Sequence, residues 1–259
     1  MVGTKMTLEV KKILSFGAIV GEREILLPNQ YVPKNCKIGD SLAVFIYTDS
    51  EDRIIATSLE PYGTLGEIVC LEVVGLSEFG VFLDLGIAKD ILMPCKDSRR
   101  YQKGQKVAVQ IGLDKEGRLL ASQNLAFQKY RKQAYVGLEA VPYRKSPLGF
   151  ECIVERKYQG LLFANEIFEP ICLGKAYEVQ VKKTRADGKI DLKLAQKNEA
   201  ECLLKLLQNN QGRLSLTKDS DAEKIVEVCQ MSKKAFKRAL HSLAHRVGQD
   251  ESGIFLLEQ

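Results

Sequence analysis

The sequence predicts a mainly β protein with a small α+β end, in which three tandem small barrels precede a helical module. Three observations support this fold class. A pattern of alternating strands and short polar turns occurs three times, at a spacing of about 65–70 residues. The hydrophobic period changes from two residues to about 3.6 after Asn198. The 259 residues, 45% of them hydrophobic, are enough for roughly three or four small domains.

Each repeat contains a predicted β-hairpin. A glycine precedes an alternating strand, a polar turn follows, and a basic residue leads into the second strand. The glycines are Gly39, Gly104 and Gly174, the turn residues are Asp52, Gly117 and Gly188, and the basic residues are Arg53, Arg118 and Lys189.

A second shared element lies upstream of each hairpin. It reads SFGAIV from Ser15, EFGVFLD from Glu78 and PLGFECIV from Pro147. About ten residues later come the short apolar stretches ILLP, ILMP and GLLF. Five short strands in about 65 residues favour a closed barrel, because closure removes exposed strand edges.

The expected domains are barrels over 1–62, 63–127 and 128–197, followed by a module over 198–259. The net charge of +5 is unevenly distributed among them. The segment 128–197 carries 14 basic and 8 acidic residues, whereas the other three are close to neutral. This asymmetry indicates that the third barrel carries much of any phosphate-binding surface.

The middle repeat resembles a known RNA-binding domain. The run GEIVCLEVVGLSEFGVFLDL from Gly66 and the stretch DILMP ending at Pro94 resemble the S-one domain of the OB-fold type. The resemblance covers nearly all of 64–125, and the first and third repeats match about half of it. The whole arrangement resembles the conserved virulence factor B family of bacterial RNA-binding proteins. That resemblance implies binding of single-stranded RNA in post-transcriptional gene regulation.

Phe79 and Phe82 are the main candidates for contact with RNA. They are three residues apart, so strict alternation would place them on opposite faces of a strand. We expect Gly80 to allow a bulge or a sharp bend that brings both rings outward. In S-one domains the matching aromatic residues stack on bases. The alternative is that one or both rings fill the barrel.

Other candidates follow from the resemblance and from charge. Asp114 and Arg118 match positions that contact RNA in the family, and Arg99 and Arg100 could follow an RNA backbone; solvated turns are the alternative. The third repeat has Glu151 where the second has Phe82, but it is basic. Its candidate RNA-binding residues are Lys157, Tyr158, Phe163, Lys182, Lys183 and Arg185. Pro28 and Pro94 stand where the family has an aromatic residue or histidine.

The C-terminal module has the element order of a winged helix. Cys202, Leu203, Leu206 and Leu207 form a helical stripe, and a strand is expected over 213–217. Ser220 and Glu223 have capping-box spacing, and a third helix is expected from about Ser232. Phe236, Ala239, Leu240 and Leu243 are its predicted core stripe. Its candidate nucleic-acid contacts are Lys233, Lys234, Lys237, Arg238 and His241.

Composition argues against several other classes of protein. The chain has only two histidines, no phosphate loop and no dinucleotide fingerprint, so we expect no enzyme, no cofactor and no metal site. The seven cysteines form no CxxC pair and are expected to be reduced thiols in the core. No apolar run is long enough to span a membrane, and the expected location is the cytoplasm. A DNA-binding regulator and a ribosome-associated adaptor remain as alternatives.

Overall fold

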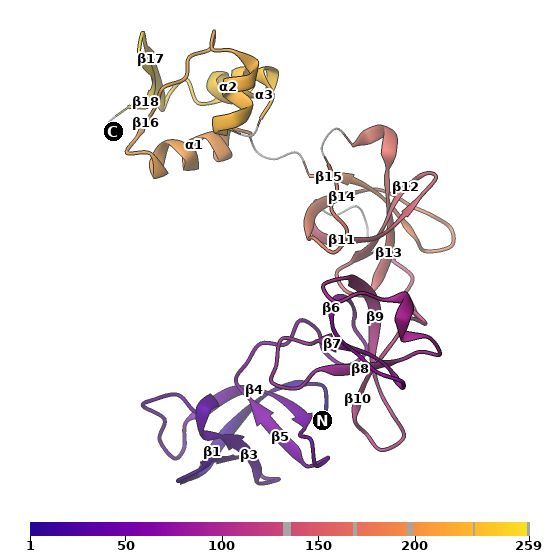
Figure 1. Ribbon diagram of the computed structural model, residues 1–259. Helices are drawn as coiled ribbons and strands as arrows, with labels where there is room; N and C mark the ends of the chain where they lie inside the picture. The colour runs from indigo at the N-terminus through magenta and orange to yellow at the C-terminus, as the bar shows by residue number, and fades with distance from the viewer. Residues whose placement is uncertain (132–135, 168–169, 196–198, 230, 258–259) are drawn as a thin grey trace. The chain divides into compact units, whose positions relative to one another are not determined.

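The computed structural model describes residues 1–131, 136–167, 170–195, 199–229 and 231–257. The chain divides into two compact units, Met1–Leu194 and Ala195–Gln259 (Figure 1). The first unit contains three closed five-stranded barrels, and the second contains three helices and a small sheet. The mainly β fold class is therefore confirmed, whereas the exact domain boundaries stay predictions.

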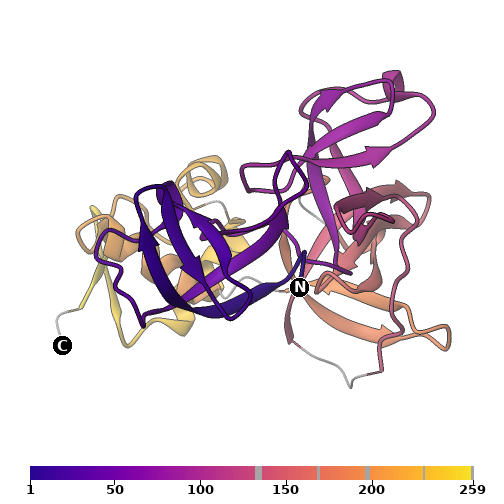
Figure 2. The ribbon, with the colours of Figure 1, turned by 90° about the horizontal axis from the view of Figure 1, so that it is seen from below.

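The first barrel consists of five strands in the order β1-β2-β3-β5-β4. They are β1 (Lys5–Leu14), β2 (Gly17–Val20), β3 (Ile25–Pro28), β4 (Ser41–Thr48) and β5 (Ile54–Thr57). Figure 2 shows these indigo strands curving around a common interior. Val10, Val20, Leu27, Ile46 and Ala56 are fully buried there. Burial of these alternating apolar side chains is the main stabilising contribution.

The second barrel repeats the same topology, and its strand order is β10-β8-β7-β6-β9. The strands are β6 (Ile68–Leu76), β7 (Gly80–Asp84), β8 (Ile91–Pro94), β9 (Lys106–Leu113) and β10 (Leu119–Ser122). Its core includes Leu71, Val81, Leu83 and Val109. Phe45 and Tyr47 of β4 belong to the same apolar cluster, so the first two barrels share buried contacts.

The third barrel has the strand order β11-β12-β13-β15-β14. Its strands are β11 (Val136–Ser146), β12 (Gly149–Val154), β13 (Tyr158–Phe163), β14 (Tyr177–Thr184) and β15 (Ile190–Leu194). The predicted hairpin is present in each repeat, as the antiparallel pairs β4–β5, β9–β10 and β14–β15. The threefold repeat is therefore real at the level of strand pairing.

The upstream glycines mark a close crossing in every barrel. A Cβ atom at Gly17, Gly80 or Gly149 would lie 2.4, 2.2 or 2.0 Å from a carbonyl oxygen of the neighbouring strand. No side chain fits at that distance, so the repeat requires glycine there. The bulge expected at Gly80 lies elsewhere. It falls in the preceding strand, between Val73 and Gly75, where the register with β7 shifts.

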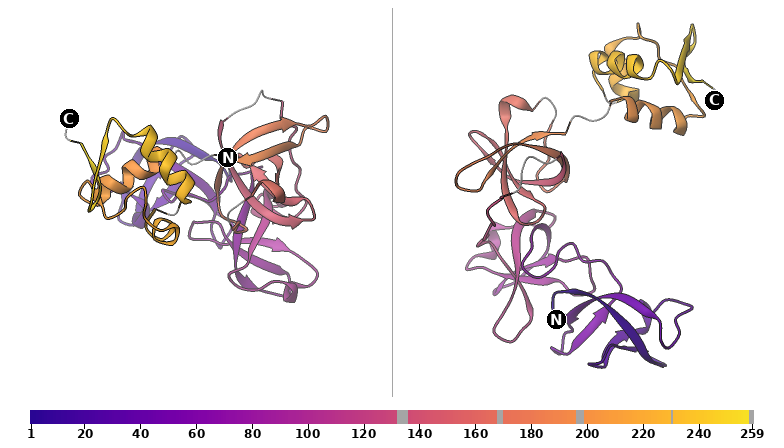
Figure 3. Two further views of the ribbon diagram at one scale, coloured as in Figure 1. Left: turned by 90° about the horizontal axis from the view of Figure 1, so that it is seen from above. Right: turned by 180° about the vertical axis from the view of Figure 1, so that it is seen from behind.

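The second unit has the predicted order of helix, strand, helix, helix and hairpin. The elements are α1 (Glu199–Asn209), β16 (Arg213–Leu214), α2 (Ala222–Cys229), α3 (Lys233–Ser242), β17 (Val247–Asp250) and β18 (Gly253–Leu256) (Figure 3). The sheet order is β16-β18-β17. Leu203, Leu207, Ile225 and Phe236 are fully buried between the helices. Among the described residues, no helix is both long and apolar enough to cross a membrane.

The serines that precede α2 and α3 play different roles. Ser232 caps α3, because its hydroxyl accepts a hydrogen bond from the Ala235 amide. The predicted capping box at Ser220 is wrong, because the Ser220 hydroxyl accepts from the Thr217 amide at 2.8 Å and α2 begins only at Ala222. The Ser220 side chain therefore stabilises a local turn and does not cap α2, although its spacing to Glu223 had predicted a cap.

Candidate nucleic-acid interface

The second barrel presents an aromatic platform to solvent, formed by Phe79 and Phe82. Phe79 immediately precedes β7 and is 70% exposed, and Phe82 lies within β7 and is 37% exposed. Val81 and Leu83 are buried in the barrel, so strand alternation turns Phe82 outward. The predicted exposure of at least one ring is confirmed, and contact with RNA stays a prediction.

The strands beside Phe82 continue this apolar surface. Phe82 lies opposite Leu92 of β8, and Leu92 is the parallel partner of Leu120 in β10. Pro94 lies opposite Gly80 at the far end of β8 and is exposed. A base stacked on Phe82 would therefore find further apolar side chains on two adjacent strands.

Cationic side chains follow β8 and precede β10, the two strands that continue this platform. Arg99 and Arg100 belong to a short 3-10 helix, Ser98–Arg100, that follows Pro94. Their side chains are 91% and 81% exposed, and both lie near the Asp97 carboxylate, at 3.0 and 3.7 Å. Salt bridges this exposed contribute little, so phosphate groups can compete for both guanidinium groups.

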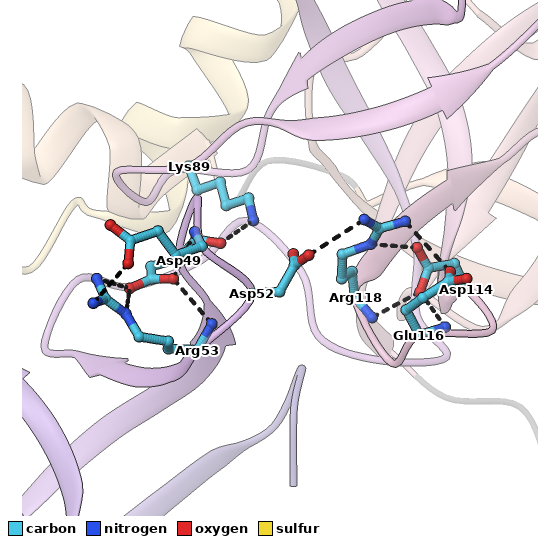
Figure 4. Close-up of polar contacts among 8 residues, drawn as sticks. Asp49, Asp52, Arg53, Lys89, Asp114, Glu116 and Arg118 are labelled. Carbon is cyan, nitrogen blue, oxygen red and sulfur yellow. Dashed lines mark hydrogen bonds and ion pairs between the residues drawn. The ribbon is translucent and has the colours of Figure 1, made fainter.

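Arg118 immediately precedes β10, and its guanidinium group already has ion-pair partners. Its Nε atom donates to Asp114 at 2.7 Å, and its other nitrogens reach Glu116 at 3.3 Å and Asp52 of the first barrel at 3.5 Å (Figure 4). The hydrogen bond with Asp114 raises the pKa of Arg118. Arg118 is therefore held in a fixed orientation by three carboxylates.

Asp114 builds the turn in the observed structure. Its side chain is 17% exposed and accepts hydrogen bonds from the amides of Glu116 and Arg118. Desolvation alone would raise the pKa of Asp114, but these hydrogen bonds and the Arg118 side chain lower it. Asp49 and Arg53 form the same arrangement in the first barrel (Figure 4). Contact between Asp114 and RNA remains a prediction.

The third barrel pairs an aromatic ring with an arginine. Phe163 ends β13 on the side of the strand that carries Gln159 and Leu161, and the Arg185 guanidinium lies 6.0 Å from its ring centroid. Arg185 also pairs with Asp191 at 2.6 Å. Such a cation–π pair offers a flat, positively charged surface for a base or a phosphate.

Lys157 and Tyr158 do not join Phe163. Tyr158 begins β13 and Lys157 precedes it, and the five residue steps from Tyr158 to Phe163 span roughly 17 Å of extended strand. The Tyr158 ring packs edge-on against the buried Tyr130, with 5.1 Å between centroids, and belongs to the rim of the core. Lys157 is exposed, as are Lys182 and Lys183 on β14. These predicted contacts are thus spread over more than one side of the barrel.

Glu151 makes the third barrel's equivalent of the platform polar. Its carboxylate accepts from Arg144 at 2.6 Å and from the Tyr143 hydroxyl at 2.8 Å. Partial burial would raise its pKa, but these bonds lower it. Burial and the bond to Glu151 raise the pKa of Tyr143. The third barrel therefore differs chemically from the second at this position.

The α3 helix presents a basic surface in the second unit. Lys234, Lys237, Arg238 and His241 are exposed on it and line a shallow groove. Lys233 is half-buried and donates to the Asp219 carbonyl at 3.2 Å. Arg238 pairs with Glu199 of α1, with Nε 3.1 Å from Oε2, so part of this charge joins two helices.

Lys89 and Asp90, which immediately precede β8, were not among the candidate site residues predicted from the sequence. Both line a cavity of about 330 Å³ between the first and second barrels. No motif distinguishes them, because their importance depends on how the two barrels pack. The cavity itself could not be anticipated from either repeat alone.

Models of known domain families match this architecture. The S1 domain matches residues 2–59 and 65–124, which contain the first two barrels. The CvfB-like winged helix domain matches residues 201–256. The first unit therefore contains nucleic-acid-binding domains of the S1 type, and the second contains a winged helix domain.

Relatives of known name align along most of the chain. The uncharacterized protein YitL of Bacillus subtilis is 29% identical over 262 residues, covering 93% of this chain and 88% of that protein. Conserved virulence factor B of Staphylococcus saprophyticus is 25% identical over 244 residues, covering 86% and 81%. A crystal structure of a Streptococcus pneumoniae multidomain protein with nucleic acid binding domains aligns over 99% of this chain and 98% of that chain, with 22% identity and a TM-score of 0.43. With its S1 domains and its CvfB-like winged-helix domain, the chain matches the conserved virulence factor B family.

Proposed function

We propose that this protein binds single-stranded RNA along the second and third barrels. The observation that carries the proposal is the exposed pair Phe79 and Phe82 on the second barrel, which also carries the exposed guanidinium groups of Arg99 and Arg100. Stacking on such rings requires unpaired bases, which duplexes do not offer. The platform therefore favours a single strand as the ligand.

The proposal extends to gene regulation in the cytoplasm. A regulatory role after transcription is what the resemblance to the conserved virulence factor B family implies. All seven cysteines are free thiols, which supports a reducing compartment. Two of them, Cys152 and Cys229, are buried as expected, whereas Cys172 is exposed. We propose binding without catalysis, because the platform needs no chemical step.

A binding comparison tests this function. The full-length protein would be titrated against a labelled single-stranded RNA, the matched single-stranded DNA and a duplex DNA, at about 50 and about 200 mM salt. We expect micromolar or tighter affinity for the RNA, which weakens as salt rises. Failure to bind the RNA, or a preference for the duplex at both salt concentrations, would contradict the proposal.

A second candidate function is duplex DNA binding by the winged helix. The exposed cations of α3 favour it, because helix-turn-helix proteins use this helix to contact DNA. Arg238, however, is engaged with Glu199. In the same titrations, this candidate predicts sequence-dependent binding of the duplex.

A third candidate is an adaptor role, for instance on the ribosome. The first barrel exposes Ile13, Phe16 and Ile54, which favours a protein partner. This candidate predicts that Phe16→Ala abolishes association with the partner while RNA affinity stays unchanged.

A further inference from the structure

The cavity between the first and second barrels has the dimensions of a small ligand site. It measures about 330 Å³, at the lower end of the range typical of small-molecule pockets, roughly 300–1,000 Å³. The turn between β4 and β5 forms one wall, and β7, β8 and β10 form the others. The lining side chains used below are Asp52, Phe82, Lys89, Asp90, Asp114 and Arg118.

One wall of this cavity is flat and apolar. Phe82 lines it, and Leu92 and Leu120 continue the surface across the two neighbouring strands. Tyr47 of the first barrel also lines the cavity. A planar heterocycle fits such a wall, because an aromatic face stacks on another at little cost in orientation.

The charged groups of the cavity do not favour a phosphate. Lys89 donates to the Asp49 carbonyl at 2.6 Å, and Arg118 is held by carboxylates (Figure 4). Asp52 pairs with Arg118 only at 3.5 Å. Acidic side chains therefore outnumber cations here, and both cations already have partners. A neutral ligand that donates hydrogen bonds is favoured over an anion.

Asp90 supplies the acceptor for such a ligand. Within the described ranges, its carboxylate has no hydrogen-bond or ion-pair partner. Asp90 is an exposed residue, and partial desolvation together with the nearby Asp84 raises the pKa of its carboxylate. A pair of neutral N–H donors would compensate this carboxylate without adding charge.

We propose that this cavity holds one unpaired guanine base of the bound strand, stacked on Phe82, with its N1–H and N2–H groups donating to Asp90. Guanine alone among the four bases offers two adjacent donors on its Watson–Crick edge. In adenine and cytosine an acceptor nitrogen adjoins the amino group, and in uracil two carbonyl oxygens flank the single N–H. Each of those acceptors would repel the carboxylate. The proposal rests on the single-strand RNA binding proposed above.

Three oligonucleotides and two variants test it. The probes are an all-uridine RNA of about ten nucleotides, the same RNA with one central guanosine, and the same with inosine, which lacks the N2 amino group. For the full-length protein, we expect one guanosine to tighten binding about tenfold over uridine, with inosine in between. Asp90→Asn should reduce the guanosine preference to about threefold or less. Glu78→Gln, which removes an exposed carboxylate beside Phe79 and outside the cavity, should keep it.

The possible failures are distinguishable. If none of the RNAs bind, the proposed function itself fails and this inference fails with it. If the RNAs bind but guanosine gives no advantage, or Asp90→Asn keeps the advantage, only the guanine site is overturned. Free guanosine should displace the strand only far above the concentration at which the guanosine oligonucleotide binds. If free guanosine binds as tightly as the guanosine oligonucleotide, the cavity takes a free nucleoside and not a base of the bound strand, and the inference is overturned.

Discussion

A Cβ atom on Gly80 would lie 2.2 Å from the carbonyl oxygen of Met93. β7 and β8 can therefore cross this closely only where the side chain is absent. The same relationship joins Gly17 to Leu27 and Gly149 to Leu162. In the second barrel it also fixes where Phe79 leaves the barrel, one residue before the crossing.

Gly80→Ala should destabilise the second barrel. The new methyl group would clash with β8, and the φ of 148° is one that side chains rarely adopt. We expect a loss of about 1–3 kcal/mol, seen as a lower melting temperature, together with weaker RNA binding. Gly104→Ala is the matched control, because Gly104 also has positive φ but has no atom within 4 Å of the added carbon. An equal loss in both variants would mean that the close crossing is not the cause.

Phe79→Ala combined with Phe82→Ala should weaken binding of single-stranded RNA by about fivefold or more, because each stacked base contributes about 1–3 kcal/mol. Titration of a labelled RNA would measure the change, and circular dichroism would verify that the barrel is folded. Phe16→Ala removes the exposed ring of the first barrel and should have a smaller effect. Unchanged affinity in the double variant would eliminate the platform from the interface.

Arg99→Ala combined with Arg100→Ala should flatten the salt dependence of RNA binding. Each lost phosphate contact lowers the slope of log affinity against log salt by about 0.7 for a single strand. We therefore expect a decrease of about 1.4, with similar loss for every RNA sequence. Lys34→Ala with Lys37→Ala removes the same charge from the first barrel, where both side chains are exposed. If that pair flattens the slope equally, net charge alone explains the effect.

The stability of the third barrel should fall in acid through Glu151. Partial burial alone would raise the pKa of Glu151, but hydrogen bonds from Arg144 and Tyr143 hold it below its usual 4.5. A lowered pKa in the folded state gives stability that is complete above the unfolded value and is lost as pH falls through the folded value. Glu151→Gln should therefore flatten the decline in melting temperature below about pH 4.5. Glu178→Gln, on an exposed carboxylate of β14, should leave the decline unchanged.

Lys234→Ala combined with Lys237→Ala should weaken nucleic-acid binding by the basic surface of α3. The fold should stay unchanged, because both side chains are exposed. Arg238→Ala should instead lower the melting temperature of the second unit, since it breaks the contact with Glu199. Duplex and single-strand titrations of the full-length protein would measure the first effect. Wild-type affinity for both ligands in the lysine variant would exclude α3 from the interface.

Much of the fold followed from short-range sequence patterns. The alternating strands, the three crossing glycines and the helical stripe around Phe236 are local, because strand and helix periods place neighbouring side chains on one face whatever lies further away. The same reasoning predicted that a third helix begins near Ser232. It failed where local signals compete, as at Ser220, and where a ring near a strand end packs inward, as at Tyr158.

The sequence by itself therefore determined that the chain forms three barrels and a winged helix, and that the second barrel carries an aromatic pair. Only the tertiary structure decided that Arg118 is shared by carboxylates of two barrels and that Asp90 faces a cavity between them. The physical reason is distance along the chain. Asp52 and Arg118 belong to different repeats, so their contact depends on how two closed barrels pack against each other, which no strand or helix period encodes.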